Sequence, residues 1–148
     1  KVNQDNLAEV SIQLFRVNLV RGRGLLCNAV MKAQSSSEEW TRVFAALVAI
    51  LNSKIPQIGE LLIARLIHQF KAGFQGRNKA SCQMACSFIA HLVNQHVVHE
   101  ILALEILTVL LENYTDISVE LAVDLTQQCG AHLMDVCKSG LISILDRF

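Results

Sequence analysis

The chain has 148 residues, of which 52% are hydrophobic but only 5% aromatic, and its formal net charge at pH 7 is zero. This length fits one domain with an aliphatic core, and a neutral chain is not a generally basic nucleic-acid binder. The charge is uneven, however, because residues 1–79 hold eleven Lys/Arg against five Asp/Glu and residues 80–148 hold two against eight. Such a bipolar chain suggests orientation of a partner more than general affinity for nucleic acid.

Three further features limit which classes of protein this chain can belong to. The longest apolar runs, residues 43–51 and 101–111, are shorter than the ~20 residues that span a bilayer, so we expect no membrane partner. The first residue is Lys1 rather than Met, which suggests a fragment of a longer protein. The cysteines are odd in number and scattered, which argues for a reducing compartment and against a disulfide framework: Cys27, Cys82, Cys86, Cys129 and Cys137.

Apolar residues at helical spacing, with no alternating pattern typical of strands, predict helices throughout. The expected ranges are about 4–17, 23–34, 38–52, 56–72, 79–94, 98–112, 117–129 and 139–147, with a turn of helix around 131–137. Ser36 and Glu39 have the spacing of a capping box, Pro56 suits a first helical turn, and Asp116 suits an N-cap. Gly73 and Gly130 are expected to end helices.

The short connections force consecutive helices to run antiparallel, either as a bundle or as a solenoid. Turns at 35–37, 73–78 and 113–116 recur at intervals of about 40 residues, which favours an all-α, HEAT-like solenoid of antiparallel helical hairpins. We expect one domain over residues 1–148, with a core that includes Phe44, Leu47, Leu51, Leu62, Leu66, Ile89 and Leu107.

Alternate turns of such a solenoid lie on alternate edges. The segments 1–4, 35–38, 73–78 and 113–116 would share one edge, and the segments 18–22, 53–55 and 94–97 would share the other.

Candidate chemical groups are few. Cys82 and Cys86 lie four residues apart, with His91 further along, but no matching third and fourth ligands accompany them. Their neighbours are core residue types, so we interpret both cysteines as buried. The remaining histidines, His68, His96, His99 and His132, form no metal-binding or catalytic pattern. We therefore expect no metal and no cofactor.

No nucleophile elbow and no Gly-rich phosphate loop occurs, so enzyme activity is not expected. Arg21–Gly24 is either a tight turn that leads into a helix or a contact for RNA phosphates, although no aromatic residues are interleaved with it. The carboxylates of Glu38, Glu39, Glu100, Glu105 and Glu112 suggest solvated helix faces. Glu105 could instead pair with a cation on a neighbouring helix.

Several long strings resemble the nucampholin family of splicing factors. They are NLVRGRGLLC (18–27), AALVAILNSK (45–54), PQIGELL (56–62), FIAHLVNQ (88–95) and HEILALE (99–105). The central helical domain of that family belongs to the class named after the middle domain of translation initiation factor 4G. The resemblance covers essentially the whole chain and is weaker at 73–79 and 135–148.

The resemblance implies a HEAT-like domain of five hairpins, of which this chain would hold roughly four. It implies a nuclear, non-enzymatic adaptor that binds the DEAD-box ATPase of the exon junction complex, holds it open and inactive, and brings it to the other proteins of the spliceosome. The alternative is a helical platform that binds RNA directly.

The resemblance also suggests a partner-binding site. Lys1, Val2 and Asn3 match the last three positions of the family's partner-binding turn. Because that turn would lie on the first edge, we extend the expected footprint along this edge to Ser36, Glu38, Arg42, Arg77 and Asn78.

Overall fold

The structure, a computed structural model, describes residues 2–113 and 115–147 and contains no strand within these ranges. The helices are α1 (Leu7–Phe15), α2 (Leu19–Ser36), the 3₁₀ helix η1 (Glu38–Trp40), α3 (Thr41–Asn52), α4 (Pro56–Gln75), α5 (Lys79–Asn94), α6 (Glu100–Glu112) and α7 (Asp116–Leu145). The all-α prediction is therefore confirmed.

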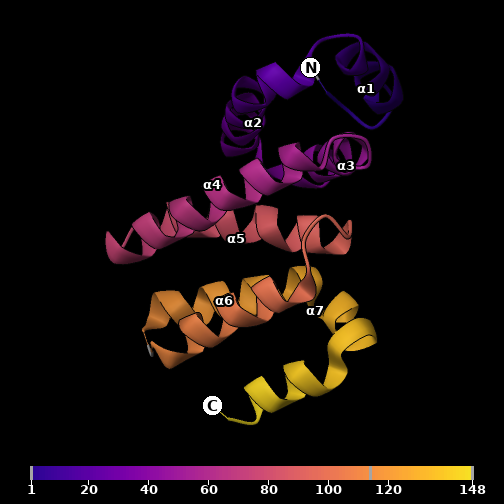
Figure 1. Cartoon of the computed structure of the whole chain (residues 1–148). Helices are drawn as coiled ribbons and strands as arrows, with labels where there is room; N and C mark the ends of the chain where they lie inside the picture. Colours follow the sequence, from indigo (N-terminus) through magenta and orange to yellow (C-terminus); the bar gives the residue numbers. More distant parts are fainter. Residues whose placement is uncertain (1, 114, 148) are drawn as a thin grey trace.

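The helices form hairpins that stack on one another as in a solenoid (Figure 1). In one layer α3 packs on α1, α5 packs on α3, and α7 packs on α5. In the other layer α2 packs on α4, whereas α6 packs mainly on α7 and has little direct contact with α4. The stack is thus continuous on one side and interrupted between α4 and α6 on the other.

The core follows the predicted aliphatic pattern. All seven predicted core residues are buried. Five of them are among the fully buried large side chains: Leu51, Leu62, Leu66, Ile89 and Leu107. α5 lies at the centre, because it packs against helices on both sides of it and buries Phe88 and Leu92 completely. Burying a side chain of this size contributes roughly 1.5–3 kcal/mol relative to leaving it exposed.

Helix starts were predicted only in part. Pro56 occupies the first turn of α4 as expected. The capping box at Ser36 was wrong, because Ser36 belongs to α2 and its hydroxyl donates to the carbonyl of Lys32 at 3.0 Å. Thr115, rather than Asp116, caps α7 by accepting from the N–H of Ser118 at 3.2 Å.

The first two helices also begin at other residues than expected. α1 begins at Leu7 rather than at residue 4. Asn3 and Asn6 instead form a closed turn in front of it, in which each side-chain oxygen accepts from the other's backbone N–H at 2.8–2.9 Å. α2 begins at Leu19, because Asn18 caps it, so the segment Arg21–Gly24 is helical and not a turn.

Neither Gly73 nor Gly130 ends a helix. Gly73 is buried inside α4, and a Cβ there would lie 3.1 Å from both Cys82 Sγ and Ser81 Cβ, so the glycine permits the close approach of α4 to α5. α7 continues through Gly130 to Leu145, with non-helical backbone angles at Cys137. The segment after Cys137 folds back onto α6, since a Cβ at Gly140 would lie 3.2 Å from Leu104 Cδ1 (Figure 1).

Two helices end in Schellman motifs that use a residue other than glycine. After α4, the Asn78 N–H donates to the Gly73 carbonyl at 2.8 Å and the Arg77 N–H to the Phe74 carbonyl at 3.3 Å. After α5, Val97 and His96 donate in the same pattern to Leu92 and Val93, at 3.0 and 2.9 Å. Arg77 and His96 consequently have φ angles of 52° and 56°, in the left-handed region that glycine occupies most easily.

Candidate partner-binding surface

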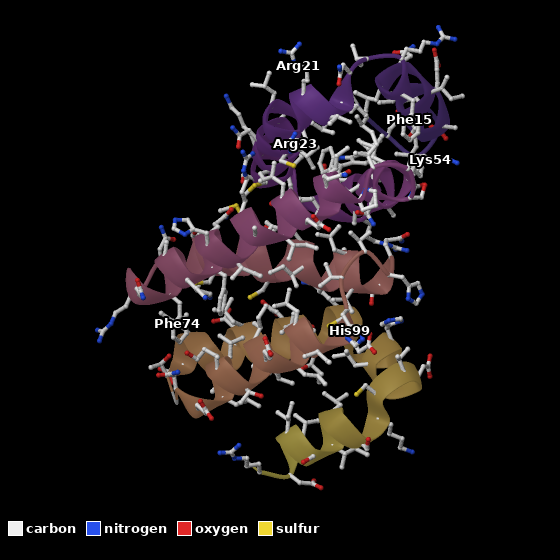
Figure 2. The ribbon with its side chains drawn as sticks, in the orientation of Figure 1. Phe15, Arg21, Arg23, Lys54, Phe74 and His99 are labelled. Atoms are coloured by element: carbon white, nitrogen blue, oxygen red, sulfur yellow. The ribbon has the colours of Figure 1, made fainter. Side chains whose placement is uncertain are left out.

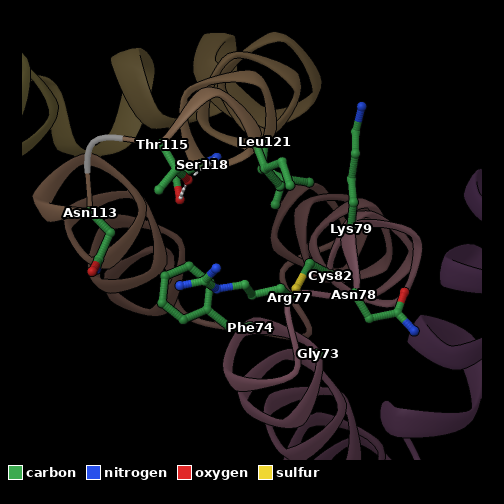
Figure 3. Close-up of a pocket in the computed structure, with 11 residues that line it drawn as sticks. Gly73, Phe74, Arg77, Asn78, Lys79, Cys82, Asn113, Thr115, Ser118 and Leu121 are labelled. Carbon is green, nitrogen blue, oxygen red and sulfur yellow. Dashed lines mark hydrogen bonds between the residues drawn. The ribbon is translucent and has the colours of Figure 1, made fainter.

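The first edge contains a cavity of about 410 Å³ between the α4–α5 turn and the start of α7 (Figure 3). It lies on the side where α6 has little contact with α4. The turns at 73–78 and 113–116 both contribute to its lining, so the prediction that they share an edge is confirmed. We call this cavity the edge pocket; its lining is Gly73, Phe74, Arg77, Asn78, Lys79, Cys82, Asn113, Thr115, Ile117, Ser118 and Leu121.

The inner lining of the edge pocket is apolar, and its side chains are held in place by contacts with the helices behind them. The Phe74 ring stacks on Phe70 with centroids 5.7 Å apart. Cys82 is buried, and its thiol donates to the Phe70 carbonyl at 3.8 Å. Leu121 of α7 is buried as well, whereas Ile117 is 40% exposed at the rim. These side chains offer a lining suited to an aliphatic group.

The rim of the edge pocket is basic. Arg77 extends across the pocket, whereas Lys79 points away from it (Figure 3) and pairs with Glu120 at 2.6 Å. Neither an ion pair nor a hydrogen bond of the Arg77 side chain is found within the described part of the chain. Among the described residues the lining contains no carboxylate, so the charge that they present to a ligand is positive.

The predicted footprint does not form one continuous patch. Arg77 and Asn78 lie at the edge pocket, whereas Asn3 belongs to the segment just before α1. Figure 1 shows α1 at the upper right of the view, apart from the α4–α5 turn at the left. Val2 packs against the hydrophobic core and is half-buried. Lys1 lies outside the described residues.

The remaining footprint residues lie near the α2–α3 junction. Ser36 and Glu38 are located there. Arg42 lines a separate polar pocket of about 290 Å³ together with His91, Asn94, Gln95 and Gln128. Asn94 and Gln95 belong to the segment 94–97 that was expected on the other edge, so the structure does not bring Arg42 to the pocket of Arg77 and Asn78. In that pocket, burial lowers the pKa of His91, and the nearby Arg42 lowers it further.

The cysteines are core residues, as interpreted from the sequence. Cys82 and Cys86 are both buried, and burial raises the pKa of Cys86 to about 12. His96 lies against His132 with ring centroids 4.8 Å apart (edge-to-face), and His99 caps α6 through its Nδ1. Within the described ranges, no three His, Cys, Asp or Glu side chains are grouped so that they could hold a metal ion.

Other charged candidates lie in solvent. Arg21 and Arg23 project from the first turns of α2 and are exposed (Figure 2), and an Arg23 nitrogen donates to the Val20 carbonyl. Glu105 is exposed on α6, which favours a solvated face over a buried ion pair. No helix of the described chain combines the length and hydrophobicity that a membrane crossing requires.

The footprint predicted from the sequence includes Arg77 and Asn78 of the edge pocket but none of its apolar residues, notably Phe74, Ile117 and Leu121. The predicted pairing of two turns on one edge was a signal that could have located it. The extension of α4 past Gly73 brings Phe74 into the lining, and the helix pattern had ended α4 too early to show this.

Comparison with known proteins gives the family. No family model matches the chain. A pre-mRNA-splicing factor CWC22 homologue of Drosophila melanogaster is 51% identical over 146 residues, which are 99% of this chain and 11% of that protein. The human CWC22 homologue is 50% identical over 147 residues, 99% of this chain and 16% of that protein. A male determiner protein of Musca domestica is 52% identical over 136 residues, 92% of this chain and 12% of that protein.

The chain thus spans only a small fraction of the curated relatives it matches. This chain itself, in contrast, is matched almost completely, since the alignments to the Drosophila and human proteins each cover 99% of its residues. The family expected from the sequence is therefore confirmed: the chain is homologous, over essentially its whole length, to one segment of the CWC22 pre-mRNA-splicing factors.

Proposed function

We propose that this chain is a non-enzymatic adaptor of pre-mRNA splicing that binds the DEAD-box ATPase of the exon junction complex. It would hold the two lobes of the ATPase apart, so that the enzyme stays inactive until it reaches the other spliceosome proteins in the nucleus. The observation that carries the proposal is the identity of about 50% to CWC22 splicing factors over 99% of the chain. The male determiner relative carries a different name, so the partner must be tested directly.

The fold is compatible with such a role. Solenoids present extended binding surfaces, which a two-lobed partner would contact at separate places. The proposed footprint is divided in this way among the segment before α1, the α2–α3 junction and the α4–α5 turn. The Asn3–Asn6 turn gives the first of these places a defined shape, since two reciprocal hydrogen bonds close it. A turn fixed in advance loses less conformational entropy when a partner binds.

The first experiment measures binding of the exon-junction ATPase by calorimetry and its RNA-stimulated ATP hydrolysis with and without this chain. We expect binding together with slower hydrolysis. If the ATPase does not bind, the proposal is wrong; if it binds and hydrolysis is unchanged, the adaptor role stands and the inhibitory role does not.

A charge reversal tests the footprint. The double substitution Lys1→Glu with Asn3→Asp should lower affinity about ten-fold or more, because like-charge contacts in a partly desolvated interface cost a few kcal/mol. The carboxylate introduced by Asn3→Asp keeps the acceptor that closes the turn with Asn6, so the fold should survive. Lys54→Glu, exposed in the α3–α4 turn (Figure 2), is the matched control and should bind normally; loss of binding only in this control would place the footprint on the other edge.

A further inference from the structure

We propose that the edge pocket binds a short peptide segment in which a large aliphatic side chain lies next to an Asp or Glu. The aliphatic group would fill the pocket, and the carboxylate would pair with Arg77. The edge pocket shares Arg77 and Asn78 with the proposed ATPase footprint. The inference concerns peptide binding by the pocket itself and does not require the ATPase to bind, so the two proposals can fail independently.

The shape and lining of the pocket select the aliphatic group. A volume of about 410 Å³ lies within the range of pockets that enclose small ligand groups. Phe74, Cys82 and Leu121 supply apolar contacts from α4, α5 and α7. One face of the Phe74 ring is already covered by Phe70, and these three helices position the lining independently of any ligand.

The charge of the rim selects the carboxylate. Lys79 is paired with Glu120, and the Asn78 side-chain oxygen already accepts from the Ser81 N–H at 3.1 Å. Asn113 uses its side-chain amide to donate to the Val109 carbonyl at 2.8 Å. Among the described lining residues, the guanidinium of Arg77 is therefore the charged group left to bind a ligand, and a guanidinium matches a carboxylate with two parallel hydrogen bonds.

The same features favour a peptide over single-stranded RNA. Sequence-tolerant RNA sites combine a basic groove along several phosphates with aromatic rings on which successive bases stack. In the part of the chain that the structure describes, the edge pocket offers one unpaired cation and one aromatic ring, and the rest of its floor is a thiol and aliphatic carbon. An acidic, aliphatic peptide complements both the floor and the rim.

Selection from a displayed library of random short peptides, with the wild-type chain as bait, tests the proposal. We expect enriched peptides to share a Leu, Ile or Met within two positions of Asp or Glu. For the strongest of them, fluorescence anisotropy should show that changing the peptide's Glu to Gln weakens binding by about three- to ten-fold, as for a partly exposed charged hydrogen bond.

Variants of the chain then locate the peptide. Arg77→Gly should weaken the Glu peptide by the same factor and abolish its advantage over the Gln peptide, whereas Arg77→Lys should retain part of that advantage. Ile117→Trp should reduce binding of both peptides, because the indole would occupy the rim of the pocket. The matched control is His96→Gly, which changes the corresponding Schellman position after α5 and should bind like wild type.

Circular dichroism accompanies each variant, so that loss of folding is recognised as such. The proposal is overturned if no peptide is enriched, or if the enriched peptides bind Arg77→Gly and Ile117→Trp as tightly as they bind the wild-type chain. It is also overturned if a labelled oligouridylate binds with an Arg77 dependence and displaces the peptide, because the site would then be one for RNA.

Discussion

The left-handed backbone at Arg77 and His96 should cost this protein stability that glycine would restore. A non-glycine residue in this conformation is disfavoured by about 1–2 kcal/mol, and at both positions the strain is imposed by paired hydrogen bonds that end a long helix. Glycine also gives the unfolded chain more conformational entropy, which reduces the stability gained from relieving the strain by about 0.4–1 kcal/mol. The net expectation is that Arg77→Gly raises the free energy of unfolding by about 0.5–1 kcal/mol.

For a chain of this length, about 1 kcal/mol moves the melting temperature by roughly 2–4 °C, so the predicted rise is roughly 1–4 °C. The measurement is urea unfolding followed by circular dichroism, and the internal control is alanine at the same site. Alanine removes the same side chain but keeps the strain, so only the difference between Gly and Ala reports the backbone. This comparison matters most at His96, where both substitutions also remove the ring contact with His132.

The reasoning is refuted if Gly is no more stable than Ala at both positions. If Arg77→Gly is more stable but no longer prefers the Glu peptide to the Gln peptide, the strained backbone at Arg77 is retained because its guanidinium is needed for binding. Strain of this kind is concentrated at functional sites.

Three more predictions concern the core and the titratable groups. Leu66→Ala, at a side chain that is 1% exposed, should lower the free energy of unfolding by about 2–5 kcal/mol, whereas Leu25→Ala, at a side chain that is 78% exposed, should change it by less than about 0.5 kcal/mol; similar losses at the two sites in urea titrations would contradict the core assignment. Burial and Arg42 lower the pKa of His91 in the folded state, so the imidazole of the unfolded chain takes up its proton at a higher pH than that of the folded chain. The free energy of unfolding should therefore fall as pH drops below about 6.5, and His91→Gln should reduce this loss. If the variant shows the same pH dependence as wild type in thermal melts, His91 is not responsible. Burial raises the pKa of Cys86 to about 12 and that of Cys129 to about 11, so iodoacetamide at about pH 8 should label the half-buried Cys137 before the four buried thiols; rapid labelling of Cys86 in mass spectra of the folded chain would indicate an open core.

The sequence was sufficient to predict the fold class and core, because both depend on patterns that are local and redundant. Many apolar residues at helical spacing report the same buried face, so an error at one position changes nothing. Helix ends depend on single residues, and there the prediction failed where two local signals competed. Ser36 and Asp116 are each good caps, but in the structure Ser36 is the last residue of α2 and the neighbouring Thr115 caps α7.

The prediction that Gly73 and Gly130 end helices failed for a related reason. Gly73 has the residue type of a helix stop, but its missing side chain serves the contact between α4 and α5 instead. The actual stop is formed by Arg77, which has no propensity for that role. Tertiary packing overrides local preference here, and the apolar half of the edge pocket was missed because it depends on that same extension of α4.

The interruption between α4 and α6 has a mechanical consequence. The last hairpin is joined to the rest of the stack mainly through α5 and α7, so that interface is the axis about which the hairpin can tilt with the least loss of packing. The edge pocket is bounded by the α4–α5 turn on one side of this axis and by the start of α7 on the other, and tilting would widen or narrow it. A ligand bound in the edge pocket would therefore fix the pitch of the superhelix. Conversely, a partner that binds the solenoid at two distant points would set the width of the pocket.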